Sequence, residues 1–256
     1  MNFRTGNSLS GWFVFFVALT TYYLTVEPTA SYWDCSEYIA TSAKLQVGHP
    51  PGAPLFQMIG AVFSSFASSP ESVAFWVNMM SVLASAFTIL FLFWSTTRVI
   101  TRFVIKDENP TGTTAFLVLG AGVVGSLSYT FSDSFWFNAV EAEVYAMAML
   151  ITSAMFWLGL RWEADMLKPR GDRWLVLIAF LIGLCFGVHF MGLLTVPAIG
   201  MLYYFRHYPF TWKSFVIANV VSIAVLLFIF KLLLPLTLSY FANAEVFFIN
   251  SFGLPF

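Results

Sequence analysis

The chain has 256 residues, of which 59% are hydrophobic, 19% are aromatic and only 10% are charged. Soluble domains carry about 25% charged residues, so the composition excludes a soluble fold and indicates an integral membrane protein. The net charge of −1, without a basic cluster, excludes the electrostatic footprint of a nucleic-acid-binding protein. Two cysteines, Cys35 and Cys185, are too few for a disulfide framework.

Apolar stretches long enough to cross the hydrocarbon layer, about 20 residues, recur along the chain. The apolar window 174–205 would be about 48 Å long as one helix, too long for a simple crossing. Two short spans with a turn at His189 keep Arg173 and Arg206 on one side, as the positive-inside rule requires. The same rule favours a non-crossing segment at 53–69. The sequence therefore predicts an all-α polytopic membrane helix bundle of about seven spans: 10–27, 73–98, 114–132, 143–160, 174–188, 190–205 and 214–234.

The charges define the predicted sidedness of this bundle. Ten of the twelve basic residues fall on one side, which the positive-inside rule assigns to the cytoplasm together with the N-terminus. Eight acids fall on the outer side, where Lys44 is the basic residue. We expect one domain, 1–256, with an outer loop at 27–72. The odd number of spans and the end at Gly253–Phe256 predict that the chain is the N-terminal part of a longer protein.

The outer loop carries the most unusual chemistry. No Gly or Pro interrupts the chain between Ser31 and Val47, which favours a helix on the membrane surface. At 100° per residue, one face of this helix is predicted to be polar and the other apolar. The polar face comprises Asp34, Glu37, Thr41 and Lys44, and the apolar face comprises Cys35, Ile39, Ala40, Ala43 and Val47. The helix is followed by His49-Pro50-Pro51-Gly52, a rigid turn that aims the next segment.

Two interpretations of these acids stay open. Asp34 and Glu37 are either a solvated face of an interfacial helix or part of a site. Glu141 and Glu143 open the fourth span, where the helix dipole favours acids. That effect explains one glutamate more easily than two, and carboxylates at a membrane boundary are usually functional. His189 is predicted near the same layer, as a structural histidine or as a member of the site.

Two strings in the outer loop resemble a known family. They are Trp33-Asp34-Cys35-Ser36-Glu37-Tyr38-Ile39-Ala40 and Gly48-His49-Pro50-Pro51-Gly52-Ala53-Pro54-Leu55. They resemble the GT-C membrane glycosyltransferases of the protein O-mannosyltransferase branch. The resemblance is closer still to a bacterial family of multi-pass proteins, formerly of unknown function, that is grouped with these enzymes. The segments Glu141–Tyr145 and Gly187–Gly192 are similar to the same family, so the resemblance covers nearly the whole chain.

The resemblance implies a GT-C-like core that moves a mannose-like sugar from a polyprenyl-phosphate carrier to Ser or Thr hydroxyls of an acceptor protein. The reaction is expected on the periplasmic face of a bacterial inner membrane. By position, Asp34 would be the general base and Glu37 would orient the acceptor or tune Asp34. The residues expected to bind the donor phosphate or the substrate are Lys44, His49, Glu141, Glu143, Tyr145 and His189. No dedicated metal cage is predicted, while a divalent cation held by Asp34, Glu37 and the pair Glu141 and Glu143 stays open.

The sequence also departs from this family's pattern. Related enzymes direct an outer arginine toward the phosphate, whereas the predicted outer side of this chain has no arginine. Two other functions therefore stay open: a multi-pass transporter or flippase, and a structural subunit of a membrane complex. A transporter would usually place its ionisable residues near the middle of the membrane, on broken helices. Here the acids gather at one boundary, which favours the enzyme.

Overall fold

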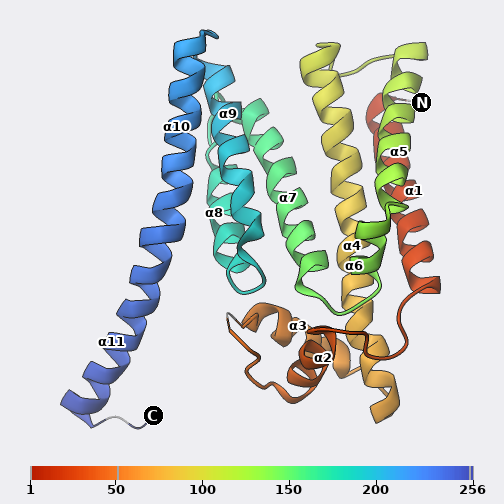
Figure 1. The fold of residues 1–256 in the computed structure, drawn as a ribbon. Helices are drawn as coiled ribbons and strands as arrows, with labels where there is room; N and C mark the ends of the chain where they lie inside the picture. Colours follow the sequence, from red (N-terminus) through yellow and green to blue (C-terminus); the bar gives the residue numbers. More distant parts are fainter. Residues whose placement is uncertain (1, 51, 254, 256) are drawn as a thin grey trace. The chain divides into compact units, whose positions relative to one another are not determined.

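The computed structural model describes residues 2–50, 52–253 and 255, and every regular element within them is helical (Figure 1). The predicted all-α helix bundle is therefore confirmed. The chain divides into two compact units, Met1–Leu193 and Leu194–Phe256, and each is described by itself.

Helix α4 (Val73–Val99) is the centre of the first unit. Its 27 residues contain neither Gly nor Pro, which suits one long uninterrupted helix, and the π-helical turn η2 (Ile100–Val104) extends it. Three long helices pack against α4: α1 (Phe3–Leu24), α5 (Gly112–Thr130) and α7 (Val144–Asp165). The shorter elements of this unit are α2 (Cys35–Lys44), α3 (Pro54–Ser64), η1 (Pro70–Ser72), α6 (Asp133–Ala139), α8 (Arg173–Cys185) and η3 (Phe190–Leu194).

Two clusters of buried apolar side chains hold the first unit together. One lies between α1, α4 and α6 and includes Val14, Ile89 and Phe93. The other joins α2 and α3 to α4, α7 and the end of α8, and includes Phe56 and Met155. Figure 1 shows α2 and α3 at one end of this unit and the N-terminus at the other end. The second cluster therefore fixes the first loop onto the ends of the long helices.

The second unit contains α9 (Thr195–His207), α10 (Trp212–Phe228), the π-helical turn η4 (Ile229–Leu233) and α11 (Leu234–Phe252). The last span is predicted to end at residue 234, but the helix continues to Phe252. Pro235 lacks an N–H and would clash with the carbonyl four residues before it in a regular helix. The wide turn η4 lies directly before this proline and lets the helix pass through it.

Four helical stretches among the described residues are long and apolar enough to cross a membrane: Pro70–Val104, Gly112–Thr130, Val144–Asp165 and Trp212–Phe252. They correspond to four of the seven expected spans, and the chain is a membrane protein. The other three expected spans correspond to α1, α8 and α9. Helix α1 has 22 residues but carries polar residues through its first half. Helices α8 and α9 have 13 residues each, about 20 Å, which is shorter than the hydrocarbon layer.

Two further expectations concern breaks and short segments. The window 174–205 is interrupted, because α8 ends at Cys185 and η3 begins at Phe190, so the turn lies around His189 as predicted. Helix α3 has 11 residues, about half of what a crossing needs. Its length therefore agrees with a segment that does not cross.

Candidate functional site

Helix α2 carries the two acids that the sequence singled out, and it is shorter than predicted. Trp33 has a φ of 61°, in the left-handed region, so the helix begins only at Cys35, with Asp34 as its N-cap residue. Leu45, with a φ of 50°, ends the helix after Lys44. Helix α2 thus spans Cys35–Lys44 rather than 31–47, and Asp34 lies at its N-terminal end.

The predicted apolar face of α2 is only partly correct. Cys35 and Ile39 are buried, but Ala40, Ala43 and Val47 are exposed, Val47 to 92%. Thr41, predicted on the polar face, is buried, and its hydroxyl group is hydrogen bonded to the side-chain amide of Gln57 at 3.1 Å. The reason is that α2 packs against α3 and α4. Its buried face therefore comprises Cys35, Tyr38, Ile39, Thr41 and Ser42.

The segment after α2 returns His49 to the helix. The N–H of Gly52 donates to the carbonyl of His49 at 2.8 Å, which holds these two residues close together. Gly52 has a φ of 65°, a conformation that glycine adopts without strain. The second proline of the predicted turn, Pro51, lies outside the described residues. A Cβ atom at Gly48 would lie only 3.1 Å from Oε1 of Glu37, so glycine permits this close approach.

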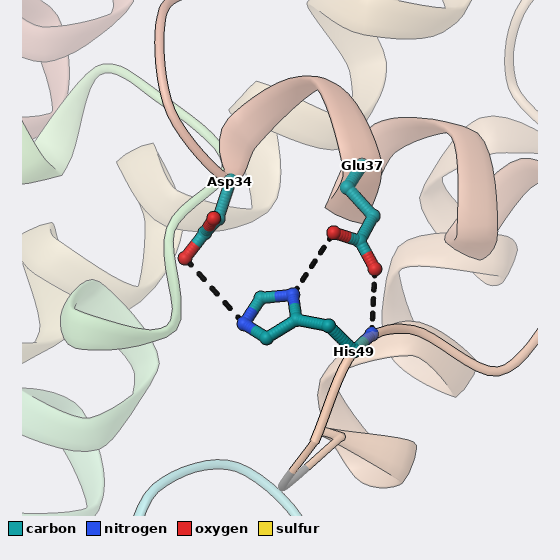
Figure 2. A group of neighbouring side chains, drawn as sticks. All are labelled: Asp34, Glu37 and His49. Atoms are coloured by element: carbon teal, nitrogen blue, oxygen red, sulfur yellow. Dashed lines mark hydrogen bonds and ion pairs between the residues drawn. The ribbon is translucent and has the colours of Figure 1, made fainter.

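His49 lies between the two carboxylates of α2 (Figure 2). Its Nδ1 atom is 2.9 Å from Oε2 of Glu37, and its Nε2 atom is 3.6 Å from Oδ2 of Asp34. The backbone N–H of His49 also donates to Oε1 of Glu37 at 2.6 Å. Glu37 therefore holds both the backbone and the ring of His49, and the ring faces Asp34. The side chains of Asp34, Glu37 and His49 are 52%, 39% and 42% exposed, so this cluster is accessible to solvent.

These contacts change the protonation of two members of the cluster. The hydrogen bond to Glu37 raises the pKa of His49, and the nearby carboxylates add to that effect. Hydrogen bonds from the ring and backbone of His49 hold the pKa of Glu37 below its usual range. Both shifts favour an imidazolium cation beside two carboxylates. The ring of His49 can therefore carry a positive charge next to Asp34.

A second acidic segment, 140–143, is joined to the first loop. The N–H of Glu27 donates to the carbonyl of Val140 at 3.0 Å, and the hydroxyl of Ser31 is hydrogen bonded to Glu141. Glu141 and Glu143 are only 5% and 9% exposed. Two acidic segments more than 100 residues apart in the sequence therefore meet at one end of the first unit, as expected from their common layer.

Glu143 differs from the exposed acids in its protonation. Burial, followed by the charges of Asp34 and Glu141, raises the pKa of Glu143 to about 7. Burial also raises the pKa of Glu141, which Ser31 partly offsets. Near neutral pH, Glu143 is thus divided between a carboxylate and a carboxylic acid that can donate a hydrogen bond. A carboxyl group in this state beside a charged cluster is typical of a functional site.

Tyr145 and His189 lie together beside this segment. Their ring centroids are 5.4 Å apart, and the N–H of Met191 donates to Nδ1 of His189 at 3.2 Å. Because Nδ1 accepts this bond, the ring proton of a neutral His189 is on Nε2. The chain before His189 also reaches α3, since the carbonyl of Gly187 accepts hydrogen bonds from Leu55 at 2.8 Å and Phe56 at 3.2 Å. The start of the Gly187–Gly192 segment is therefore hydrogen bonded to the first turn of α3, which follows His49 in the chain.

Lys44 is not brought to the cluster. It is the last residue of α2, whereas Asp34 precedes the first, so the two are about 15 Å apart along the helix axis. Among the described residues, Lys44 takes part in no ion pair. His49 is therefore the cation that the structure places beside Asp34.

The same three side chains have the spacing of a possible cation site. One ligand atom from each of Asp34, Glu37 and His49 lies within 4.8 Å of the others. Oxygen and imidazole ligands suit several divalent ions. His49 would have to give up its proton to bind one, and its raised pKa opposes that. The pair Glu141 and Glu143 is not part of this group of ligands.

Asn78 is a site-supporting residue that the sequence analysis did not single out. It is completely buried within α4, and its amide donates to the carbonyls of Glu27 at 2.7 Å and Thr29 at 3.0 Å. It therefore holds the start of the first loop against α4. An amide side chain inside an otherwise apolar span is the signal that could have identified it, because such a group needs partners there.

The fold and these contacts define a helical membrane protein with a carboxylate–histidine cluster where its first loop meets the helix ends. Residues 34–212 match the family described as the protein O-mannosyl-transferase TMEM260 N-terminal domain, which is more than half of the chain. The chain therefore belongs to that family. The match begins at Asp34 and includes Glu37, His49, Glu143 and His189.

Two relatives illustrate the likeness. The chain is 26% identical over 146 residues to the protein O-mannosyl-transferase tmem260 of Dictyostelium discoideum, which covers 56% of this chain and 16% of the relative. It is 27% identical over 171 residues to the protein O-mannosyl-transferase TMEM260 of Mus musculus, which covers 67% of this chain and 22% of the relative. The chain thus spans less than a quarter of the length of either relative. No solved structure matches the chain.

Proposed function

We propose that the protein is a membrane glycosyltransferase that transfers a mannose-like sugar from a polyprenyl-phosphate carrier to Ser or Thr hydroxyls of an acceptor protein. The observation that carries the proposal is the cluster of Asp34, Glu37 and His49, which lies in the part of the chain that matches the protein O-mannosyl-transferase family. The names of the two relatives support the reaction class. We place the reaction on the periplasmic face of a bacterial inner membrane, in a GT-C-like core.

Asp34 would be the general base of this reaction. An acceptor oxygen forms a bond to the anomeric carbon of the sugar, the bond from that carbon to the phosphate oxygen breaks, and the phosphate leaves with the electron pair. The acceptor hydroxyl gives its proton to a carboxylate within hydrogen-bond reach. Asp34 suits this task because its side chain is half exposed and is free of any strong hydrogen bond among the described residues. Its partner His49 is 3.6 Å away.

Glu37 and His49 would position the reacting groups and balance their charge. The departing phosphate carries negative charge that needs donors or a cation nearby. The raised pKa of His49 supplies an imidazolium, and Glu37 fixes its ring. The protonated form of Glu143 can donate a hydrogen bond to the same phosphate, while Tyr145 and His189 would bind the substrate beside it. These residues would take the place of the arginine that is absent from the predicted outer side of the chain.

Replacement of Asp34 by asparagine tests the proposal. The Asp34→Asn variant keeps the shape of the side chain but cannot accept the proton, so we expect sugar transfer to fall by roughly 10²- to 10⁴-fold. The measurement is transfer of radiolabelled mannose from polyprenyl-phosphate mannose to a Ser- and Thr-containing acceptor, in membranes that carry the full-length protein.

Asp133→Asn is the matched control, because Asp133 is an acid at the start of another helix, α6. It should retain transfer. Full activity of Asp34→Asn would contradict the role of Asp34, and absence of transfer by the unmodified protein would contradict the proposed reaction.

A further inference from the structure

In the first unit, the end that carries the N-terminus lies opposite to α2 and α3 (Figure 1). A cavity of about 590 Å³ lies at that end. It opens between the start of α1, the end of α4 and the end of α7. Four basic side chains line it, Arg4, Arg98, Arg161 and Lys168, together with two acids, Glu108 and Asp165. The cavity therefore carries an excess of positive charge. It is separate from the cluster of Asp34, Glu37 and His49.

Two of the four cations that line this cavity form no ion pair among the described residues. Arg98 is 3.4 Å from Glu108, and Lys168 is 2.9 Å from Asp165. Among the described residues, Arg4 and Arg161 form no ion pair. The guanidinium of Arg161 lies over the rings of Trp157 and Trp174 instead. Two positive charges are thus available to an anion.

Two polar atoms in the wall of the cavity have no partner in the described part of the chain. Nε of Arg98 and Oδ1 of Asn7 are both buried and make no hydrogen bond there. Buried donors and acceptors are rarely left unpaired in folded proteins. An oxyanion in the cavity would give Arg98 the acceptor that it lacks, and a hydroxyl group of the same ligand would give Asn7 a donor.

The apolar side of the cavity indicates what kind of molecule carries this anion. Trp94, Trp157 and Phe3 line it beside the basic residues. The exposed apolar side chains of Leu9 and Phe13 follow on α1, next to the cavity-lining Ser8. Tryptophans together with basic residues at the end of membrane-spanning helices are typical of the headgroup layer, and basic pockets between such helices bind lipid phosphates.

We propose that this cavity binds the phosphate-bearing headgroup of an anionic membrane lipid. The phosphate lies among Arg4, Arg98 and Arg161, and the acyl chains follow the apolar surface of α1. A free phosphate offers the same charge but has no apolar part to occupy that surface. The apolar wall therefore favours the lipid as the source of the phosphate.

The test measures lipid binding to the full-length protein in detergent by native mass spectrometry, with phosphatidylglycerol, phosphatidylcholine and inorganic phosphate as probes. The unmodified protein should bind phosphatidylglycerol more tightly than phosphatidylcholine. Each basic side chain near a membrane surface contributes roughly 5-fold to the affinity for anionic lipid, so Arg4→Gln/Arg161→Gln should weaken phosphatidylglycerol binding about 30-fold. The control Arg170→Gln/Lys213→Gln also removes two exposed positive charges, but outside the cavity, and should bind as the unmodified protein does.

A third variant should improve binding, which a folding defect cannot mimic. Glu108→Gln removes an acid from the cavity wall and frees Arg98, so the affinity for phosphatidylglycerol should rise about 5-fold. The proposal is overturned if Glu108→Gln does not increase the affinity, or if the double variant and its control lose the same amount. Displacement of the lipid by an equal concentration of inorganic phosphate would also overturn it, in favour of a soluble anion.

Discussion

The chemistry of the candidate site depends on the contrast between exposed and buried carboxyl groups within one cluster. Asp34 and Glu37 are open to solvent, and an exposed ion pair such as Glu37–His49 contributes little to stability by itself. Glu143 is buried, and its carboxylate form is disfavoured there. Near neutral pH the site therefore holds an ionised acid, Glu37, and a partly protonated acid, Glu143. When the surroundings of two carboxyl groups shift their pKa values apart, one group can act as an acid and the other as a base.

Glu143 should make the protein less stable as the pH rises. Its pKa is near 4.5 in an unfolded chain and about 7 in the folded protein. Between these values the folded protein binds the extra proton, so stability falls from about pH 4.5 to about pH 7 and the full penalty, at most about 3 kcal/mol, remains above it. Glu143→Gln removes the charge. Its melting temperature in detergent should exceed that of the unmodified protein at pH 8, and the difference should shrink at pH 5.

Glu71→Gln serves as the control for this measurement. Glu71 is exposed and its pKa lies below the usual range, so its replacement should not stabilise the protein at pH 8. If Glu143→Gln gave the same gain at pH 5 as at pH 8, burial of the ionised carboxyl group would not be the cause.

Some of the site residues could be predicted from the sequence and others could not. Asp34 and Glu37 are three residues apart, which places them on one face of any helix. The return of His49 to that face depends on the left-handed Leu45, on Gly48 and on the turn that follows, and no periodicity describes such a path. Lys44 shares the helix face of Asp34 but lies too far along its axis to reach it. Sequence spacing on a helix thus predicts the face on which a side chain lies better than its distance from another side chain.

At the scale of single elements, α3 connects the first loop to the segment around His189. Its first N–H groups donate to the carbonyl of Gly187, which replaces the side-chain cap that the helix lacks. The contact between α3 and Gly187 could therefore not be predicted from the two strings of the outer loop alone. The face that α2 buries follows from its packing on α3 and α4, and this packing cannot be read from the pattern of α2 alone.

Gly187→Ala should disrupt this connection. The added Cβ would lie 2.7 Å from Cβ of Leu55, an atom that no side-chain rotation can move away. Overpacking of this kind costs about 1–3 kcal/mol, so we expect a clear fall in the melting temperature together with a loss of order in α3. Hydrogen exchange of the amides in Pro54–Ser64 measures the local effect.

Gly183→Ala is the matched control, because Gly183 is also a glycine and lies four residues before Gly187. A Cβ at Gly183 meets nothing within 4 Å, and the residue is within α8, where alanine is favoured over glycine. Its melting temperature should stay the same or rise. Equal destabilisation by both variants would show that the contact between Gly187 and Leu55 is not responsible.

At the scale of the whole molecule, the structure and the charge distribution together predict that Lys44 and Arg170 lie on opposite sides of the membrane. The first loop is joined to Val140 and Glu141, just before α7, and Arg170 follows the other end of α7. With 22 residues, α7 is about 33 Å long, enough to cross the hydrocarbon layer. Lys44→Cys should therefore react with a membrane-impermeant maleimide in intact cells, and Arg170→Cys only after permeabilisation. The native Cys35 and Cys185 are buried and should give little background.

Labelling of both variants from the same side would contradict the layout of the first unit. Composition identified the membrane class and the longest helices, because apolar length is a local property. It did not identify the continuation of the last helix past Pro235, since the turn η4 is a backbone adjustment without a sequence signature of its own.

The hydrogen bond between Leu55 and Gly187 joins two segments that the ribosome synthesises at different times. The first loop is among the earliest segments to be synthesised, yet it needs Val140 and Gly187 as partners before α3 is anchored. About 160 residues separate Glu27 from Gly187, and translation at about 5–20 residues per second takes roughly 8–30 s to cover them. The start of α3 thus gains its partner at Gly187 only late in synthesis. A nascent chain that stalls before Gly187 has been synthesised would carry Asp34, Glu37 and His49 without this anchor of α3.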